Sequence, residues 1–483
     1  MRTNSEPGFP SDLLVDLHER NGRGLREQLE HHLRAAIQQG RVAPGATLPP
    51  SRILAAELGI GRGVVVDAYS NLKADGYLEA RQGAQTRVRL DTHGEPAAKP
   101  IERVPVDLQS FFVRPRETLV RPVGPVRLLG GLPDPALFPR TRWVRHYRAA
   151  VAAVPDGDLT YPDAFGATAL RMALRGYLGR VRGVDTEPER ILVCSGVTQG
   201  LTLVCRALRR AGARHVAVED PCFAVHRQAI AMAGLEPVPV RSDADGLDPS
   251  ALGDVDAVLV TPAHSYPRGA TLGAARRHAL VAWARERQAL IIEDDYDAEL
   301  RYDRTPIGAL QGHAPQHVVH LGSASKTLTP ALRLGWIAAP ATLIDALVRE
   351  KHFDDMGSSL IEQLAFARFV DSGDLARFLR RVRPIYRDRR DATIAALDEL
   401  MPTVRWQGEA AGLHLHVELE DGVDEMAMAE AAKERGILLE NASWHWARPR
   451  QAPPSIVLGY GALPVPAARH VVSLLAEAMR RAS

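Results

Sequence analysis

The chain has 483 residues, of which 46% are hydrophobic and 24% charged, and its formal net charge is only +2. This composition excludes a disordered chain, and the length suits two or three domains of roughly 100–200 residues each. The three cysteines lack the spacing of a disulfide framework or a zinc site, and no run of about 18 apolar residues could span a membrane. We therefore expect a cytoplasmic protein without a structural metal site.

The first predicted elements are three helices in residues 24–90. Apolar side chains recur every four residues over 25–37, which predicts an amphipathic helix that ends near Gly40. Ser51 is placed to cap a short second helix, which Gly59 would end before a third helix follows. This order predicts a helix-turn-helix module.

A two-stranded ribbon and a linker are predicted next. Beyond a turn at Gln82-Gly83, basic side chains alternate with others in the order Thr86, Arg87, Val88, Arg89 and Leu90. The ribbon would therefore have one basic face. Residues 91–125 contain six prolines and show no amphipathic period, so we interpret them as a linker.

Short β-rich runs alternate with helical segments after the linker, which predicts a parallel sheet covered by helices. The runs are ILVC at 191–194, HVAV at 215–218, AVLV at 257–260, ALII at 289–292 and VVHL at 318–321. A smaller α+β subdomain is expected from about residue 375. The predicted domains are 12–90 and 126–483, separated by the linker.

One lysine stands out beyond the carboxyl ends of these strands, where ligands bind in open α/β sheets. Only five of the 60 basic residues are lysines, and Lys326 follows the last run in the sequence SASK. Lysine can form an imine, whereas arginine cannot because it stays protonated. An acid at Asp294 and hydroxyl-rich turns complete the groups that pyridoxal phosphate requires. A solvent-exposed lysine is the alternative interpretation of Lys326.

Several segments resemble the MocR/GabR family of GntR-type transcriptional regulators. They are TPAHSYPRG at 261–269, IIEDDYDAELRYD at 291–303 and GSASKTLTPALRLGW at 322–336, and the similarity runs from about residue 127 to the C-terminus. Residues 24–90 resemble the winged helix-turn-helix of the same family. The resemblance implies an N-terminal winged helix-turn-helix, a fold-type I aminotransferase-like large domain that binds pyridoxal phosphate, and a small C-terminal α+β domain.

The resemblance gives a role to each motif residue of the cofactor site. Lys326 would carry the internal aldimine, Asp294 would pair with the pyridine nitrogen, and Tyr296 would hydrogen-bond the phenolic oxygen. Phe223 would stack on the ring. The other implied residues are Val197, Thr198, Ser323, Ser325 and Arg333 at the phosphate, His264 in the turn at 261–269, and Tyr161, which resembles a tyrosine that reaches the phosphate of the neighbouring subunit.

Four of these roles have an alternative interpretation. Asp295 could pair with the nitrogen instead of Asp294 if the register differs by one residue. Phe223 could be a core residue, which is the commoner fate of a phenylalanine. His264 could be a structural turn histidine, and Tyr161 could pack in the core.

The expected contact for a substrate carboxylate is missing. Enzymes of this fold commonly place an arginine in a late strand, but SIVLGYGALP at 455–464 contains none. Arg448 and Arg450 lie nearby in a proline-rich segment. The carboxylate contact of an effector therefore stays unassigned.

The winged helix-turn-helix implies contacts with DNA. A recognition helix that begins near Arg62 would enter the major groove, and the candidate contacts are Arg52, Arg62 and Arg87. Surface ion pairing is the alternative role of each arginine. Gly61 and Gly63 flank Arg62 where relatives usually have small polar residues, so we expect DNA binding to persist with an altered operator preference.

We interpret the chain as a regulator that binds double-stranded DNA and senses pyridoxal phosphate, an amino compound or both. The missing late-strand arginine and the attached DNA-binding module favour this over a working aminotransferase with an accessory module, so no catalytic residue is assigned and the chain is predicted not to be an enzyme. A regulator that has lost the cofactor conflicts with the presence of both Lys326 and Asp294. The resemblance also implies a homodimer, and no membrane partner is expected.

Overall fold

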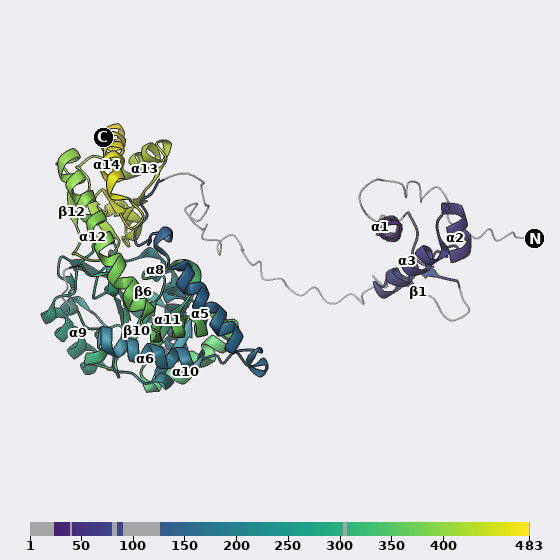
Figure 1. Cartoon of the computed structure of the whole chain (residues 1–483), viewed down its shortest axis with the longest axis horizontal. Helices are drawn as coiled ribbons and strands as arrows, with labels where there is room; N and C mark the ends of the chain where they lie inside the picture. Colours follow the sequence, from purple (N-terminus) through teal and green to yellow (C-terminus); the bar gives the residue numbers. More distant parts are fainter. Residues whose placement is uncertain (1–23, 39–40, 80–84, 90–125, 303–306, 483) are drawn as a thin grey trace, which may run out of the picture. The chain divides into compact units, whose positions relative to one another are not determined.

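The computed structural model describes residues 24–38, 41–79, 85–89, 126–302 and 307–482. The chain forms two separate compact units, Met1–Leu119 and Val120–Ser483 (Figure 1). The predicted linker lies outside the described residues, and so do Gln82, Gly83 and Leu90 of the predicted ribbon.

Three helices and a short ribbon make up the N-terminal unit. In chain order they are α1 (Leu25–Gln38), α2 (Ser51–Leu58), α3 (Arg62–Ala74), β1 (Leu78–Glu79) and β2 (Arg87–Val88). Their apolar faces meet in one core, which includes Leu29, Leu33, Leu54, Val65 and Leu72. In the antiparallel ribbon Leu78 lies opposite Val88 and both are buried, which leaves Arg87 exposed to solvent.

The N-terminus of α2 differs from the prediction. Pro50 occupies the N-cap position, Ser51 is the first helical residue, and no side-chain cap hydrogen bond forms. The restricted φ of proline, −52° here, already turns the chain into the helix, so the serine lies one position too late to cap it. Gly59 ends α2 as predicted, with a left-handed φ of 63° that costs a glycine little.

An eight-stranded sheet forms the centre of the C-terminal unit. Its strands are β4 (Ile191–Cys194), β5 (His215–Asp220), β6 (Glu236–Asp243), β7 (Gly246–Leu247), β8 (Ala257–Val260), β9 (Leu290–Asp294), β10 (Val318–Ser323) and β11 (Gly335–Ala338), in the order β4-β11-β10-β9-β8-β5-β6-β7. All five predicted runs are strands. Because β9 and β10 extend further than predicted, Asp294 and Ser323 are the last residues of strands.

The five predicted strands are parallel to one another, but two strands that were not predicted from the sequence run antiparallel to their neighbours. β11 is antiparallel to both β4 and β10, and β7 is antiparallel to β6. Residues 324–334 join β10 to β11, and Ala244 and Asp245 join β6 to β7. These connections are shorter than the crossover of about a dozen residues or more that parallel neighbours need. The loop over 324–334 carries Lys326.

Helices surround this sheet (Figure 1). They are α5 (Arg140–Ala153), α6 (Thr168–Arg182), α7 (Val197–Arg210), α8 (Ala224–Met232), α9 (Ala274–Arg287), α10 (Ala341–Asp355) and α11 (Leu360–Asp371). Every residue of β4, β8 and β10 is buried. Burial on both faces explains why these strands are continuous apolar runs in the sequence rather than alternating ones.

The small subdomain is built on a second, four-stranded sheet. Its elements are α12 (Asp374–Leu400), β12 (Arg405–Gln407), β13 (His414–Glu418), α13 (Glu425–Glu434), β14 (Ile437–Leu438), β15 (Glu440–Asn441), β16 (Ser455–Gly459) and α14 (Val465–Ala482), and its sheet order is β12-β13-β16-β15. β3 (Val126–Arg127) pairs in parallel with β14, so the first described residues of this unit join the subdomain. No helix in the described ranges is long and apolar enough to cross a membrane.

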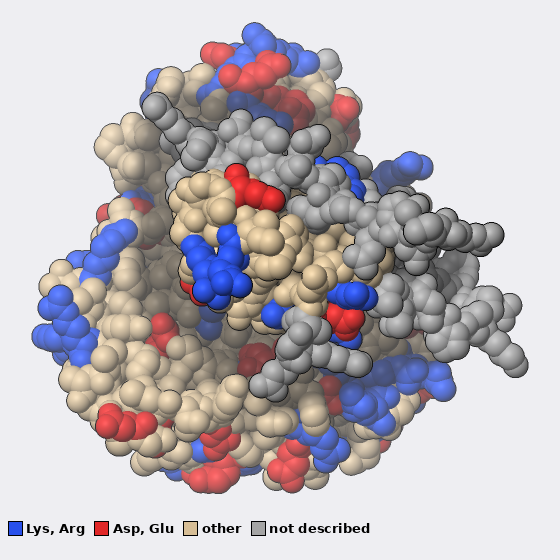
Figure 2. Space-filling view, turned by 90° about the vertical axis from the view of Figure 1, so that its right-hand side faces the viewer, with Lys and Arg blue, Asp and Glu red and all other residues tan. Residues whose placement is uncertain are grey.

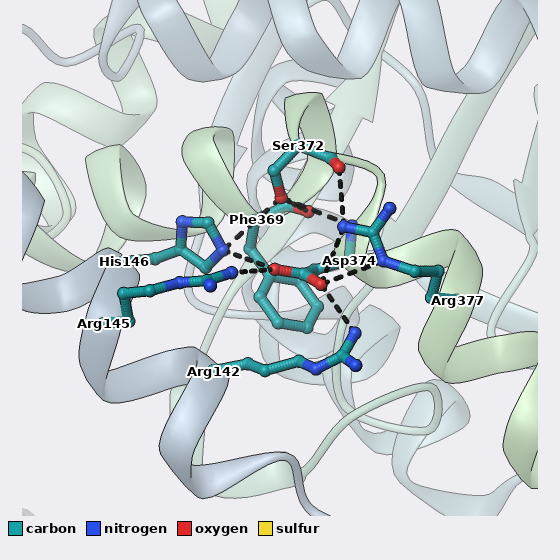
Figure 3. A network of polar contacts seen from close by, with 7 residues as sticks. All are labelled: Arg142, Arg145, His146, Phe369, Ser372, Asp374 and Arg377. Atoms are coloured by element: carbon teal, nitrogen blue, oxygen red, sulfur yellow. Dashed lines mark hydrogen bonds and ion pairs between the residues drawn. The ribbon is translucent and has the colours of Figure 1, made fainter.

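An ion-pair network around the buried carboxylate of Asp374 holds the start of α12 to α5 (Figure 3). The Asp374 carboxylate, 1% exposed, accepts hydrogen bonds from Arg142 at 2.7 Å and Arg145 at 2.8 Å. His146 at 2.7 Å and Arg377 at 2.9 Å complete the network. Burial opposes ionisation, but these partners hold the pKa of Asp374 well below its usual range. Both carboxylate oxygens are engaged, so the network fixes the two helices relative to each other.

Candidate functional site

Lys326 lies in the loop after β10, at the carboxyl edge of the large sheet, and its side chain is partly buried. Burial lowers the pKa of the Lys326 amine, and the nearby carboxylates of Asp297, Glu440 and Asp294 oppose that shift. A lowered pKa increases the fraction of neutral amine, the form that attacks an aldehyde. The backbone approaches this amine closely, since a Cβ at Gly131 would lie 3.3 Å from the Lys326 Nζ.

Asp294 is the last residue of β9, and only one of its two carboxylate oxygens has a partner among the described residues. Its Oδ2 lies 3.2 Å from the Nε2 of His226, and both side chains are buried. Its Oδ1 is buried and has no hydrogen-bond partner among the described residues. A buried polar atom without a partner is costly in a folded protein. The Asp294 Oδ1 is therefore an acceptor available to a ligand donor.

Asp295 has a different environment from its neighbour. Arg182 donates to its two oxygens at 2.7 and 2.9 Å, and the His320 Nε2 lies 2.9 Å away. Burial opposes ionisation, but Arg182 and His320 hold the pKa of Asp295 well below its usual range. Consecutive residues at a strand end point to opposite sides. Asp295 is therefore bound inside the domain, and of the two candidate acids only Asp294 has a free oxygen.

His264 and Tyr296 form a second polar group beside Lys326. The His264 Nδ1 lies 2.8 Å from the Asp297 Oδ2 and 3.2 Å from the Tyr296 hydroxyl. Burial and the charge of Asp297 raise the pKa of Tyr296 well above its usual value, so the hydroxyl keeps its proton and can donate it. The His264 Nε2 has no partner in the described part of the chain.

Phe223 lies at the N-terminus of α8, and its side chain is half-buried. Its ring packs edge-on against His226 at 5.3 Å and Tyr266 at 5.5 Å between centroids, and it stacks on His445 at 6.1 Å. Tyr296 belongs to the same apolar cluster. The ring is thus part of the site wall and is not enclosed in the core.

Three of the predicted phosphate residues, Val197, Thr198 and Arg333, lie at the N-terminus of α7. Val197 and Thr198 begin this helix, whose free amides and dipole favour an anion. Arg333, with a left-handed φ of 49°, places its guanidinium there, since a Cβ at Gly196 would lie 3.3 Å from both terminal nitrogens. Ser323 and Ser325 are neighbours, because the Ser325 amide donates to the Ser323 hydroxyl at 3.4 Å.

Tyr161 is not brought into this group by the structure. Its side chain is 76% exposed, so it is not a core residue, which was the alternative interpretation. Arg448 and Arg450, the arginines noted near the late strand, are also exposed, at the short 3-10 helix Pro449–Gln451. No group of histidine, cysteine, aspartate or glutamate in the described ranges could hold a metal ion.

The three candidate DNA contacts are exposed on the N-terminal unit. Arg52 lies in α2, Arg62 begins α3 and Arg87 lies in β2. Within the described residues none of them forms an ion pair. Figure 2 shows acidic and basic side chains interspersed over the visible face of the molecule rather than one continuous basic patch. The side chains of these three arginines are therefore accessible to DNA.

Comparison with known proteins identifies both units. Residues 25–88 match the family of bacterial regulatory proteins called gntR, and residues 139–447 match aminotransferase class I and II. The chain is 34% identical to the HTH-type pyridoxine biosynthesis transcriptional regulator PdxR of Corynebacterium glutamicum, over 97% of this chain and 99% of that protein. It is 29% identical to the probable rhizopine catabolism regulatory protein MocR of Rhizobium meliloti, over 86% and 85% of the two chains.

The chain belongs to the MocR-type GntR transcriptional regulators. Its large unit also resembles the Pyrococcus horikoshii kynurenine aminotransferase solved in complex with PMP, with a TM-score of 0.69 and 26% identity over 78% of this chain and 98% of that one. The predicted family, the fold class and the function of a DNA-binding regulator with an aminotransferase-like domain are confirmed.

Several residues of this MocR-type regulator's site were not found from the sequence. They are His226, Tyr266, His414, Glu440, His445 and Val457. Glu440 illustrates why, since it accepts a hydrogen bond from the amide of Gly130, 310 positions away in the chain. The subdomain strands that carry His414, Glu440 and Val457 are only two to five residues long and have no motif of their own. The sequence showed one partial signal, the tryptophan-flanked histidine at 444–446.

Proposed function

We propose that this MocR-type regulator senses pyridoxal phosphate, an amino compound or both at Lys326, and that binding changes its affinity for operator DNA. The observation that carries the proposal is the presence of two groups at one edge of the sheet: the Lys326 amine, whose pKa burial lowers, and the buried Asp294 oxygen that has no partner among the described residues. The name of the PdxR relative supports pyridoxal phosphate itself as one signal.

The residues fit the cofactor at each of its ends. Lys326 would hold the aldehyde carbon, the free Oδ1 of Asp294 would accept from the ring nitrogen, and Tyr296 would donate to the phenolic oxygen. Phe223 would cover one ring face. The proposed phosphate ligands are Val197, Thr198, Ser323, Ser325 and Arg333, and His264 would orient Tyr296. When bound, pyridoxal phosphate supplies an aldehyde that joins reversibly to an amine.

Coupling to DNA requires a difference between two arrangements of the protein. A ligand shifts DNA affinity only if it binds the DNA-competent and DNA-incompetent arrangements unequally. Gly130 and Glu440 connect the start of the unit and the subdomain to the surroundings of Lys326. We propose that release of Lys326 by an incoming amine moves the small subdomain, and that this motion is the signal.

A homodimer in the cytoplasm is part of the same proposal. Phe353, at 83% exposure, and Tyr161 are large exposed side chains on neighbouring segments, because a Cβ at Gly357 would touch Pro162. Leu159 is exposed on the same segment as Tyr161. A second copy of the chain would cover these side chains and would bring Tyr161 to its partner's phosphate site.

The pH dependence of cofactor capture tests the environment of Lys326. Because burial lowers its pKa, the neutral amine persists to lower pH than in free lysine. The rate of pyridoxal phosphate capture should therefore reach half of its maximum clearly below pH 10.4, roughly the pKa of a free lysine side chain. Stopped-flow absorbance across a pH series measures this midpoint. A midpoint at or above that value would contradict the proposed environment.

Replacing Arg62 with alanine should weaken binding to the DNA upstream of the protein's own gene. Arg62 begins α3 and is exposed, and loss of one arginine contact to DNA costs about 1–3 kcal/mol. A gel-shift titration measures the change. Arg26→Ala is the matched control, since Arg26 lies in α1 and pairs with Glu30. Equal affinities of Arg62→Ala and the natural chain, or no binding to this DNA at all, would count against the assignment.

The alternative function is a working aminotransferase, which the aminotransferase relatives leave open. We expect the purified chain, supplied with an amino donor and a keto acid, to form at most about one equivalent of product per protein, since β16 offers no arginine for a carboxylate and binding energy is needed for turnover. Chromatography of the products gives the stoichiometry. Sustained multiple turnover would make regulation the secondary role.

A further inference from the structure

One wall of the site beside Lys326 is apolar and aromatic. Val457, in β16, is buried in one cluster with Tyr266 and Tyr296, and Phe223 packs against this cluster. The main chain at Gly130 packs closely against Val457, since a Cβ at Gly130 would lie 2.7 Å from the Val457 Cγ1. At this position β16 therefore presents the methyl groups of Val457 to the site and not a cationic side chain.

The charges near Lys326 are negative. Three acids, Asp297, Glu440 and Asp294, act electrostatically on its ammonium. Asp297 already has His264 at 2.8 Å, and Asp294 has His226 at 3.2 Å. A ligand carboxylate placed here would be repelled, whereas a second ammonium group would be attracted.

Glu440 is the carboxylate best placed to receive such a group. Its side chain is 14% exposed, with the Oε1 3.0 Å from the His445 Nε2 and the Oε2 3.0 Å from the Gly130 amide. Burial opposes ionisation, but the hydrogen bond from His445 and the other donors keep the pKa of Glu440 below its usual value. The group therefore stays a carboxylate, which can accept a hydrogen bond from an ammonium group.

The ring arrangement also favours a cation. Tyr266 lies 5.5 Å from Phe223 and 5.0 Å from His445 between ring centroids, in edge-to-face contacts. Aromatic faces attract ammonium groups. Apolar ring surface also suits the methylene chain between two amino groups.

Two arginines beside this wall donate hydrogen bonds to main-chain carbonyls. Arg227 donates to the main-chain carbonyls of His445 and Trp446, at 2.6 and 2.9 Å. Arg268 donates to the carbonyl of Ser242 at 2.9 Å, and its guanidinium lies over the ring of Trp446. These contacts hold both guanidinium groups at residues 444–446.

We propose that the amino compound recognised at Lys326 lacks a carboxylate and carries a second cationic group, which Glu440 receives, as in a linear aliphatic diamine. This inference rests on the proposed function, since it names the ligand class of the same site. The exchange at Lys326 involves no oxidation. The ligand nitrogen would form the double bond to the aldehyde carbon while the Lys326 Nζ gives up its own, and the two protons that the incoming ammonium loses would convert the released Lys326 to its ammonium form.

Titration of the full-length chain loaded with pyridoxal phosphate tests the proposal. Putrescine, 4-aminobutyrate and L-alanine are added separately, and the visible absorbance and the melting temperature are recorded. We expect half of the absorbance change at a putrescine concentration about tenfold or more below that of 4-aminobutyrate, because a charged hydrogen bond in place of a repulsion is worth at least that factor. An equal or stronger response to 4-aminobutyrate, or no response to any amine, overturns the inference.

Two variants locate the selectivity. Glu440→Gln should lose about tenfold in putrescine response, whereas the exposed Glu434→Gln control should keep it. Val457→Arg should shift the preference toward 4-aminobutyrate, because it adds a cation to the wall. Unchanged preference in both Glu440→Gln and Val457→Arg would overturn the inference. Failure of the natural chain to take up pyridoxal phosphate is a separate outcome, which overturns the proposed function and this inference with it.

Discussion

Replacing Lys326 with alanine should abolish both the yellow colour of the chain with pyridoxal phosphate and the effect of pyridoxal phosphate on DNA binding. Only an amine can form an imine with the aldehyde, and an arginine cannot replace it because its guanidinium stays protonated. The carboxylates and hydroxyls of the site cannot form an imine either. Affinity for DNA without the cofactor should stay within about twofold, since the substitution lies outside the winged helix-turn-helix. Absorbance spectra and gel-shift titrations with and without the cofactor measure these quantities.

The control for this experiment is another lysine. Lys433→Ala removes an exposed lysine of α13 that pairs with Glu430, so it should keep both the colour and the response. A Lys326→Ala chain that still turns yellow and still responds to pyridoxal phosphate would contradict the assignment. Colour lost without any change in the DNA response would separate cofactor binding from regulation and would refute the proposed coupling.

Replacing Arg182 with alanine should lower the free energy of unfolding by about 3–5 kcal/mol, the cost of leaving a buried charge without its partner. Arg182 is 4% exposed and holds both oxygens of Asp295, which would retain only His320. Urea denaturation followed by circular dichroism measures this loss. A change below about 1 kcal/mol would show that the Asp295 network carries little stability.

Asp294→Asn provides the contrast with that substitution. Its Oδ1 has no partner in the described chain, so the unfolding free energy should change by less than about 1 kcal/mol. Retention of pyridoxal phosphate should fall about tenfold or more, because an amide is a weaker partner for a protonated ring nitrogen than a carboxylate. Equilibrium dialysis gives the retention. If Asp294→Asn unfolds the protein and Asp295→Asn loses the cofactor instead, the two roles are reversed.

The sequence allowed the framework of the large unit to be predicted, because the signals there are local. Buried strands such as β4 and β8 are continuous apolar runs, and Lys326 stood out as one of few lysines in a strand-end motif. The direction of β11 was not predictable from apolar pattern alone. The direction follows from the short connection after β10. A run of four apolar residues does not by itself indicate whether a strand is parallel or antiparallel to its neighbour.

The choice between Asp294 and Asp295 shows where sequence reasoning needed the structure. The two residues are chemically identical neighbours, and the motif alone left both interpretations open. Their partners decide between them, and these come from distant positions: His226 for Asp294, and Arg182 with His320 for Asp295. Glu440 and Val457 were missed for the same reason, since their place beside Lys326 depends on how the subdomain folds back.

Borohydride reduction followed by peptide mass mapping tests the central claim most directly. The full-length chain is incubated with pyridoxal phosphate, reduced and digested, and the peptide that contains Lys326 is analysed. The account predicts one reduced pyridoxyl group per chain, attached at Lys326 and absent from the other four lysines. A chain that carries no such group at Lys326, or carries it only on other lysines, would contradict the account.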